Sequence, residues 1–412
     1  LLVKGLCAVL SAGALLCDSR DSDEQLAGGA TSVIGPILLE VQTGTGSIPD
    51  SACTDVDVWS QWSDRYASSL RLLSAAINAA PPSAVFLLWQ QIWETIANAV
   101  QLVRALVSID ATFQELAEAV ISVLVETPRC FADSSFVRDL EGAAAASLCD
   151  TAISGFTAPS LLNRANWLQP LSATVRCCEE GSLALAAVAE SFPTAAEAFL
   201  AGMQQASRDT DENTAVWSSM YSLILDLAIK CPSVLCRETA QLPLLLDMLV
   251  DDLLRADGCA ASDRTAGTVG LRIIAQLRKW AFAQPEAGET RIHLAQLVQQ
   301  WLIARGELAT AVGILGGASG ALPPWMIDNL ADALWGLGEL VGGQRLGSVL
   351  HSALCSEVLP FPVRRLKPEA RTTALGPLLA AKDRRIFKRS LKAICGGKKK
   401  GVSGAPPATA CT

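Results

Sequence analysis

Histidine is the residue on which most catalytic triads and many metal sites depend, and this chain has only two, His293 and His351. A Ser/His/Asp or Cys/His nucleophile would have to use one of them, because the histidine takes the proton from the nucleophile. Both stand beside apolar residues in helical patterns, and the sequence has no G-x-S-x-G motif. We therefore interpret both as side chains on helix surfaces.

The thirteen cysteines are the next candidates for chemistry. None forms a C-x-x-C pair, and Cys177 and Cys178 are adjacent, which suits neither a metal site nor an ordinary disulfide. Most of the others lie inside apolar helical patterns. We interpret them as reduced thiols that pack as small hydrophobic side chains, which predicts a reducing compartment and no zinc site.

Phosphate-binding and acid–base patterns are also missing from the sequence. The glycine-rich stretch 316–320 leads into two prolines, and the stretch 342–348 lacks the lysine of a P-loop. Two acidic pairs, 179–180 and 251–252, join consecutive residues, which do not share a helix face. The sequence therefore predicts a protein that is not an enzyme and that has no cofactor.

The C-terminal segment 382–395 is the sharpest local feature, with apolar residues on one helical stripe and basic residues on the other side. Its basic residues are our candidate partner-binding site: Lys382, Arg384, Arg385, Lys388, Arg389 and Lys392. Three interpretations stay open here. The segment caps the fold with a solvated basic face, it docks an acidic partner or folds against the acidic body, or it is a nuclear-localisation or RNA-binding patch.

Helical patterns position these residues. Ala and Leu dominate, aromatics are 5%, and no sustained apolar–polar alternation occurs, so the composition predicts an all-α fold. About sixteen helices follow one another, separated by short Pro, Gly or polar breaks. Many are apolar on more than one face and must lie between neighbours. We therefore predict an α-solenoid of stacked HEAT/armadillo-like helix pairs over residues 1–395, with a period of about 40–47 residues.

Three other predictions concern the ends of the chain and its surroundings. The chain begins at Leu1, and we expect a fragment that lacks N-terminal repeats, with residues 5–16 as a buried helix rather than a signal peptide. A polar loop is predicted at about 18–51, and a disordered basic Gly/Pro/Ala tail at 396–412. No stretch reaches the ~18 uncharged apolar residues that a membrane span needs.

Charge is divided unevenly along the chain. After position 360 there are thirteen Lys or Arg and two acidic residues, a net charge of +11, which leaves −19 for residues 1–360 of a chain whose total is −8. An acidic body favours basic partners, although the same charge also serves simply to keep a large surface soluble. The ten tryptophans are interpreted as core residues rather than platforms for nucleic-acid bases, because the body is acidic.

Parts of the C-terminal half resemble the transportin-3/importin-13 family of karyopherin-β nuclear transport receptors. The matching stretches are 215–254, the segment from Leu322-Pro323-Pro324 to Leu340, and the final basic helix 381–395; in the first half, 90–93 (QQIW) is the best local match. The resemblance implies a receptor that binds protein cargo and that is controlled by the GTPase Ran; the acidic charge of the body predicts that this cargo consists of basic or RNA-binding proteins.

The resemblance further implies that Ran binds N-terminal repeats missing from this chain, that nucleoporins are partners, and that the protein shuttles between cytoplasm and nucleus. The lack of a membrane span and the acidic body predict no binding to membranes and no direct binding to nucleic acids. One departure matters. Relatives that import Arg/Ser-rich proteins carry an arginine-rich helix, and the matching stretch here, 112–126, has no arginine. The alternative function is a HEAT/armadillo scaffold that assembles a complex without Ran. The cargo and the direction of transport stay open.

Overall fold

The computed structural model describes residues 20–49, 55–80, 85, 88–107, 113–131, 138–157, 164–205, 211–237, 241–254, 343–355 and 375–395, and single positions between 269 and 338. Across these residues the secondary structure is helical and no strand occurs, so the predicted all-α class is confirmed for them. The run 5–16 and the tail 396–412 lie outside the described residues. The chain divides into two compact units, Leu1–Leu245 and Leu246–Thr412.

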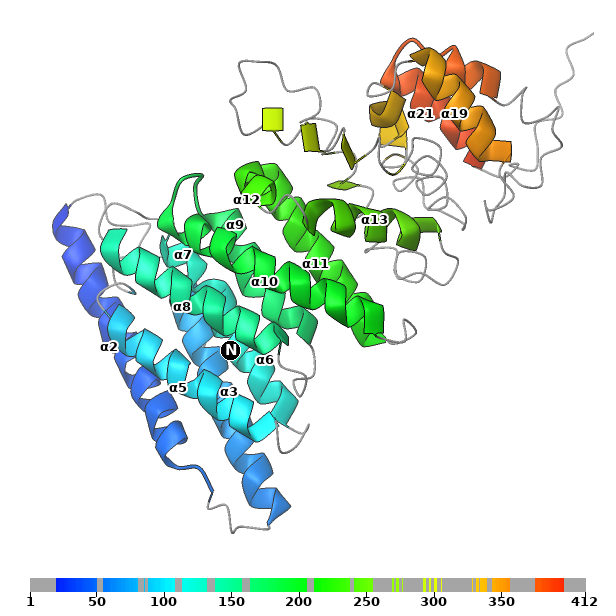
Figure 1. Cartoon of the computed structure of the whole chain (residues 1–412). Coiled ribbons are helices and arrows are strands. Elements are labelled where there is room, and N and C mark those ends of the chain that lie inside the picture. Colours follow the sequence, from blue (N-terminus) through cyan, green and yellow to red (C-terminus); the bar gives the residue numbers. More distant parts are fainter. Residues whose placement is uncertain are drawn as a thin grey trace, which may run out of the picture. The chain divides into compact units, whose positions relative to one another are not determined.

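Unit 1 is built from helices of very different lengths (Figure 1). In chain order they are α2 (Arg20–Gly46), α3 (Val56–Ala79), α5 (Trp89–Val107), α6 (Gln114–Glu126), α7 (Pro128–Phe131), α8 (Arg138–Thr157), the 3-10 helix η2 (Arg164–Leu168), α9 (Gln169–Cys177), α10 (Leu183–Gln205), α11 (Asp211–Lys230) and α12 (Pro232–Arg237). Helix α13 (Gln241–Leu254) begins in unit 1 and ends in unit 2.

The long helices of unit 1 lie in two rows. In the first row α2 packs on α5, α5 on α8, and α8 on α10; in the second row α3 packs on α6, α6 on α9, and α9 on α11. The rows also touch each other, through α2 and α3, α5 and α6, and α8 and α9. Helices therefore alternate broadly between the rows along the chain, and each one packs on neighbours that are close in sequence.

Helix α6 shows how this arrangement uses a sequence that is apolar on several sides. Leu116, Val120 and Leu124 are buried, and so are Ala117 and Ile121 on other faces. Helices α3, α5 and α9 supply the contacts. Burying one such side chain stabilises the fold by roughly 1.5–3 kcal/mol, so a helix enclosed on this many sides is held by packing rather than by its intrinsic propensity.

The predicted polar loop at 18–51 is wrong for most of its length, because Arg20–Gly46 forms α2. Its C-terminal half has apolar residues at helical spacing, and Ile34, Leu38 and Val41 are buried. The hydroxyls of Thr43 and Thr45 donate to the carbonyls four residues earlier, at 2.7 and 3.1 Å. Residues typical of loops are thus accommodated in a helix, because its apolar stripe has neighbours to pack on.

Prolines mark helix boundaries less reliably than the sequence predicts. Pro128, Pro170 and Pro232 do stand in the first turn of a helix, where the missing N–H is not needed. Pro193, however, is predicted to open a new helix, and α10 continues through it. An interior proline costs ~3 kcal/mol. Phe192, beside it, is 2% exposed, and burial of such large side chains offsets that cost.

Glycine allows one close approach between elements of unit 1. Gly155 lies on α8 beneath the indole of Trp167 in η2, and a Cβ at this position would overlap the ring. Trp167 is fully buried. The small residue therefore lets a large aromatic side chain pack directly on a helix backbone.

Helix α10 has the length and composition of a membrane span over Leu183–Met203, the single such helix among the residues searched. About half of this stretch, 56%, is buried inside the protein. Phe192 and Phe199 are 2% and 1% exposed, and α10 packs on α8 and α9. The apolar composition is accounted for by these contacts with neighbouring helices.

Unit 2 is described in less detail. It contains α19 (Gly343–Cys355) and α21 (Arg384–Cys395), with a helical turn at 375–379 between them. Leu346 of α19 packs closely on Gly338, and Leu379 lies against Gly347. The buried residues Leu350, Leu375 and Leu391 belong to this small core.

Candidate functional site

Helix α21 carries five of the six basic residues of the predicted site, since Lys382 stands two residues before it, and the structure fixes the orientation of the helix. Asp383 caps the helix, since its carboxylate accepts a hydrogen bond from the Ile386 N–H at 2.9 Å. Phe387 and Leu391 are each 1% exposed. The Phe387 ring stands edge-on to Trp335, with ring centroids 5.4 Å apart. Phe387 and Leu391 of the predicted apolar stripe therefore face inward, whereas Ile386, which the sequence places on the same stripe, is 41% exposed.

Three of the six basic residues form ion pairs within unit 2, and we call them the paired stripe. Arg384 donates two hydrogen bonds to Asp332. Lys388 and Lys392 both reach Asp328, at 3.1 and 2.7 Å. The cations stand four residues apart on α21, and so do their acceptors, so two facing helical segments are in register.

Asp328 is the centre of this contact. Its burial alone would raise the pKa of the carboxyl, but the hydrogen bonds and charges of Lys392 and Lys388 outweigh that effect and lower the pKa below its usual range. The carboxylate is therefore charged at neutral pH and compensated by two ammonium groups.

The other three basic residues, Lys382, Arg385 and Arg389, are exposed, and we call them the free stripe. None of them forms an ion pair among the described residues of the chain. The structure thus divides the predicted site: half of it folds against acidic residues of its own unit, as one of the three interpretations expects, and half faces solvent.

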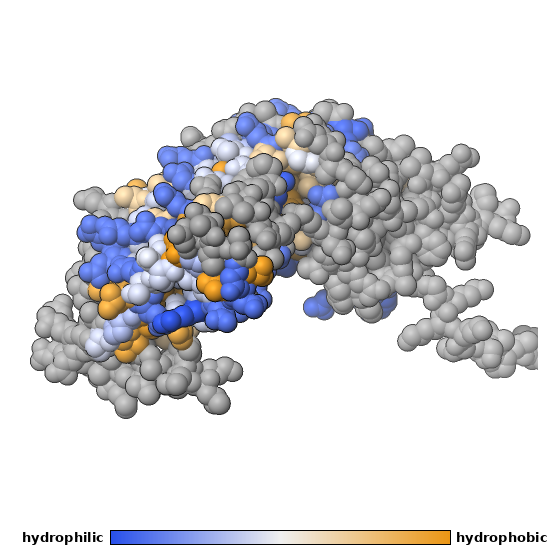
Figure 2. Space-filling model, turned by 90° about the horizontal axis from the view of Figure 1, so that it is seen from below, coloured by the Kyte–Doolittle hydropathy of each residue, from blue (hydrophilic) through white to orange (hydrophobic). Residues whose placement is uncertain are grey.

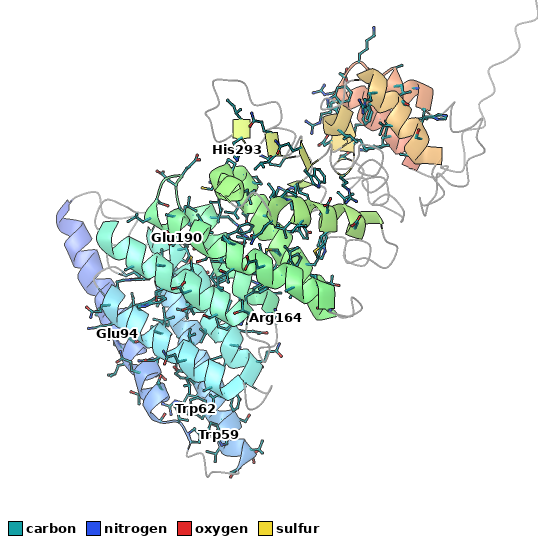
Figure 3. All side chains as sticks on the ribbon, viewed as in Figure 1. Trp59, Trp62, Glu94, Arg164, Glu190 and His293 are labelled. Atoms are coloured by element: carbon teal, nitrogen blue, oxygen red, sulfur yellow. The ribbon has the colours of Figure 1, made fainter. Side chains whose placement is uncertain are left out.

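A second charged surface lies on the first row of unit 1, where the sequence singles out no site. Helices α5, α8 and α10 expose carboxylates at Glu94, Asp150, Glu190 and Glu197. Helix α10 contains no Lys or Arg, and the side chains of Arg104 on α5 and Arg138 on α8 are outside the described set. The charged side chains that are described on these three helices are therefore all negative, and the nearest described cation contributed by another element is Arg164 of η2, which donates to the Phe156 carbonyl at the C-terminal end of α8; Figure 3 labels Glu94, Glu190 and Arg164. We call this surface the acidic face.

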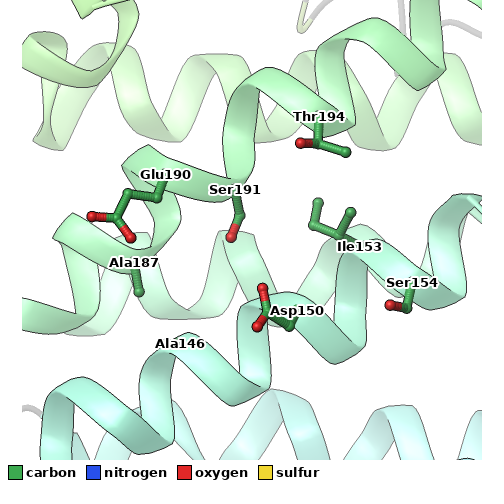
Figure 4. A pocket seen from close by; sticks show the side chains of 8 residues that line it. All are labelled: Ala146, Asp150, Ile153, Ser154, Ala187, Glu190, Ser191 and Thr194. Carbon is green, nitrogen blue, oxygen red and sulfur yellow. The ribbon is translucent and has the colours of Figure 1, made fainter.

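The acidic face is hollowed between α8 and α10 (Figure 4). The hollow has a volume of about 500 Å³. Its lining is polar at Asp150, Ser154, Glu190, Ser191 and Thr194, and apolar at Ala146, Ile153 and Ala187. In Figure 4 the side chains of Asp150 and Ser191 point toward each other across it.

Cys149 lies next to this hollow but is unsuited to nucleophilic chemistry. Burial, together with the charge of Asp150, raises the pKa of its thiol to about 12, although a hydrogen bond with Ser191 acts in the opposite direction. The thiol is therefore protonated at neutral pH, whereas nucleophilic attack needs the thiolate. What the hollow offers is hydrogen-bond acceptors and negative charge.

The second row of unit 1 handles its charges differently. Arg71 of α3 pairs with Glu115 of α6 at 3.3 Å, and Arg176 of α9 pairs with Asp226 of α11 at 2.9 Å. Arg129 of α7 pairs with Glu126 at 3.6 Å. These pairs join neighbouring elements, so these three cations are compensated by carboxylates within unit 1.

The remaining candidates from the sequence are not brought together into a site. His293 and His351 are both exposed at helical positions, as predicted. No group of three potential metal ligands occurs among the residues that were searched. Trp167 and Trp217 are in the core, as predicted, whereas Trp59 and Trp62 are half-buried in an aromatic cluster with Tyr66 and Phe113.

Apolar side chains are also exposed where α2 ends and α3 begins. Val56 and Val58 are 77% and 42% exposed, and Ile48 is 39% exposed. Figure 2 shows the molecule from below, and on the face seen there orange hydrophobic residues lie among blue hydrophilic ones. Residues 50–54, between the two helices, are not among those described.

The sequence was compared with known protein families and with curated proteins, and neither comparison identifies a relative. A scan against protein-family models finds no match, and a search of the curated proteins finds no similar sequence.

Proposed function

We propose that the chain is an α-solenoid that binds basic segments of other proteins on its acidic face. The observation that carries this function is the contrast of charge in unit 1, where the first row exposes Glu94, Asp150 and Glu190 without cations in the described part of the row, while the second row exposes cations as well and joins Arg71 and Arg176 to carboxylates of neighbouring helices. A surface with one uncompensated sign attracts partners of the opposite sign.

The recurrence of polar contacts along the chain supports the solenoid. Side-chain links between elements recur at similar sequence separations, as expected where each helix meets its counterpart one repeat later. Six examples are Gln42–Thr95 (53 residues), Arg71–Glu115 (44), Ser74–Ser122 (48), Arg176–Asp226 (50), Trp301–Asp247 (54) and Arg384–Asp332 (52). Five of these separations are somewhat longer than the 40–47 residues that the sequence predicts.

The hollow between α8 and α10 suggests how a basic side chain is held. Asp150 and Glu190 supply charge, while Ser154, Ser191 and Thr194 supply hydroxyl oxygens that accept hydrogen bonds from an ammonium or guanidinium group. A single exposed ion pair contributes only about 0.2–1 kcal/mol. Useful affinity therefore requires several contacts in series, which a face spread over three helices provides.

Within this proposal, a nuclear transport receptor of the transportin-3/importin-13 type is the specific function we favour, because of the resemblance over 215–254 and 381–395. Recognition of Arg/Ser-rich domains is left out of it. Helix α6, which covers most of the matching stretch, has no arginine and exposes little beyond Glu115 and Ser122. The partners expected for the acidic face are basic proteins.

Binding of a fluorescent Lys/Arg-rich peptide to the full chain tests the acidic face. We expect the triple variant Glu94→Gln, Asp150→Asn, Glu190→Gln to weaken binding about tenfold at low salt, with the difference shrinking as salt screens the charges. A control variant removes three carboxylates from the second row instead: Asp57→Asn, Asp64→Asn, Glu115→Gln. Equal weakening by both variants would reduce the interaction to net charge and contradict a specific face.

Affinity capture from cell extract, with and without GTP-locked Ran, separates the receptor from the scaffold. The experiment uses the protein as the cell makes it, because the resemblance assigns Ran binding to N-terminal repeats of the receptor. Release of the bound proteins by Ran supports a transport receptor. A bound set that ignores Ran supports the alternative, a scaffold with the same helical architecture.

A further inference from the structure

The free stripe of α21 is arranged as a single surface. Arg385 and Arg389 are four residues apart on α21, so their side chains lie along one side of the helix, and the exposed Lys382 stands two residues before the helix begins. The acidic residues that the structure places nearby are already engaged: Asp328 and Asp332 bind the paired stripe, and Asp383 caps the helix. These three cations therefore form no ion pair among the residues described.

The free stripe is also held in a fixed orientation. On one side of α21, Phe387 and Leu391 are buried; on another, the paired stripe is bound by Asp328 and Asp332. A helix fixed on two sides cannot rotate to bring Arg385 and Arg389 against the protein. A partner that binds them consequently meets a surface that needs little further ordering.

An apolar side chain accompanies the cations. Ile386 is 41% exposed, and it stands three residues before Arg389 on α21, so it borders the free stripe. Leu379, in the turn before the helix, is 45% exposed. The surface thus combines guanidinium groups, which recognise carboxylates through paired hydrogen bonds, with apolar contact area.

We propose that this surface, formed by Lys382, Arg385, Arg389 and Ile386, binds a short acidic peptide segment of a partner protein that carries an apolar residue among its carboxylates. It is a second docking surface, opposite in charge to the acidic face of unit 1 and independent of the function proposed for that face. In this proposal Arg385 and Arg389 bind carboxylates of the peptide, so the peptide must be acidic. Ile386 contacts its apolar residue.

Two other anionic partners fit the surface less well. Binding of single-stranded nucleic acid uses exposed aromatic side chains for base stacking, and the aromatic residue of α21, Phe387, is buried against Trp335. Binding of an anionic membrane by an amphipathic helix uses its apolar face, and here Phe387 and Leu391 are occupied by the core of unit 2. An acidic peptide needs neither an exposed aromatic side chain nor the apolar face that carries Phe387 and Leu391.

The test is a titration of the full chain against a fluorescein-labelled twelve-residue peptide of Glu and Asp with one central Leu. We expect the double variant Arg385→Gln, Arg389→Gln to weaken binding about tenfold or more, and Ile386→Ser about threefold. The matched control, Arg65→Gln with Lys230→Gln, removes the same charge from exposed positions of unit 1 and should leave the affinity within about twofold.

Three outcomes would overturn the proposal. The control variant weakens binding as much as the Arg385/Arg389 variant does, the peptide without Leu binds as tightly as the peptide with it, or the wild-type chain binds a single-stranded oligonucleotide or phosphatidylserine vesicles more tightly than the acidic peptide. If this proposal fails, the proposal for the acidic face of unit 1 is not affected, because that proposal is tested with a basic peptide.

Discussion

The two rows of unit 1 are alike in architecture and opposite in their treatment of charge. Each consists of helices that pack side by side, and each buries aliphatic residues against the other. On the second row, Arg71 and Arg176 find carboxylates on the next helix; on the first, Asp150 and Glu190 line a hollow. Packing therefore determines where a helix lies, while charge pairing determines which face remains available to a partner.

The same contrast recurs within a single helix of unit 2. On α21 the paired stripe is held by Asp328 and Asp332, and the free stripe points outward. In both units, charged groups that are paired inside the protein contribute to the fold, and the surfaces that we propose for binding are formed by groups without such a pair among the described residues. Four substitutions test this division, starting with the one of largest expected effect.

Leu124→Ala tests whether the two rows share one core. Leu124 is fully buried on α6, which packs on α5 of the first row and on α3 and α9 of the second. We expect a loss of about 2–5 kcal/mol in the free energy of unfolding, from lost burial and the cavity left behind. Thermal melts followed by circular dichroism would measure it. Ser122→Ala, at an exposed position of the same helix, is the control; equal melting temperatures for the two variants would mean that α6 joins no common core.

Asp328→Asn tests the paired stripe. It leaves Lys388 and Lys392 without their carboxylate, and we expect a loss of about 1 kcal/mol, detected as faster amide hydrogen exchange in α21. Because the folded pKa of Asp328 is lowered, its contribution is complete above the unfolded pKa of about 4 and is lost as the pH falls below that value. The variant should therefore differ from the wild type at pH 7 and approach it near pH 2. A difference that does not depend on pH would contradict the ion pair.

Arg176→Gln removes one of the ion pairs of the second row. Its guanidinium is 61% exposed and pairs with Asp226, so we expect a loss of only about 0.2–1 kcal/mol, reduced further in 1 M salt. Urea unfolding at low and high salt would measure it. Arg65→Gln, an exposed cation of the same row, provides the baseline; an equal effect of both changes would show that pairing across helices adds nothing.

Glu190→Gln tests the first row and should have the smallest effect on stability. Removing one of two carboxylates that line the same hollow relieves repulsion, so we expect a change within about 0.5 kcal/mol, in the stabilising direction. The midpoint of urea unfolding would show it. A loss of more than about 1 kcal/mol would mean that Glu190 has a partner inside the fold, and the contrast between the rows would fail at that residue.

The sequence predicts the helical class well, because Ala, Leu and the apolar spacing on stretches such as 114–126 leave few alternatives. It fails at 20–46 and at Pro193, where local residue types argue for a loop or a break. In both places contacts with neighbouring helices determine the local structure. Ile34, Leu38 and Phe192 are buried by helices that no local sequence pattern can identify.

The candidate site is predicted only in outline for a similar reason. All six basic residues of 382–392 look equivalent in the sequence, but the acceptor of Arg384 lies 52 residues away. Nothing local distinguishes Arg384, which is paired, from Arg385, which is not. The acidic face is missed because Glu94, Asp150 and Glu190 come from three separate helices, and only packing places their exposed sides on the same row.

The links between elements at separations of about fifty residues bear on how the chain assembles during synthesis. Gln42 meets Thr95 and Arg71 meets Glu115, so within the described part of unit 1 these helices find their partners soon after emerging from the ribosome. Translation at about 5–20 residues per second delivers fifty residues within several seconds. Unit 1 is therefore able to close progressively, one neighbour at a time, and its apolar helices spend little time exposed to chaperones or to other nascent chains.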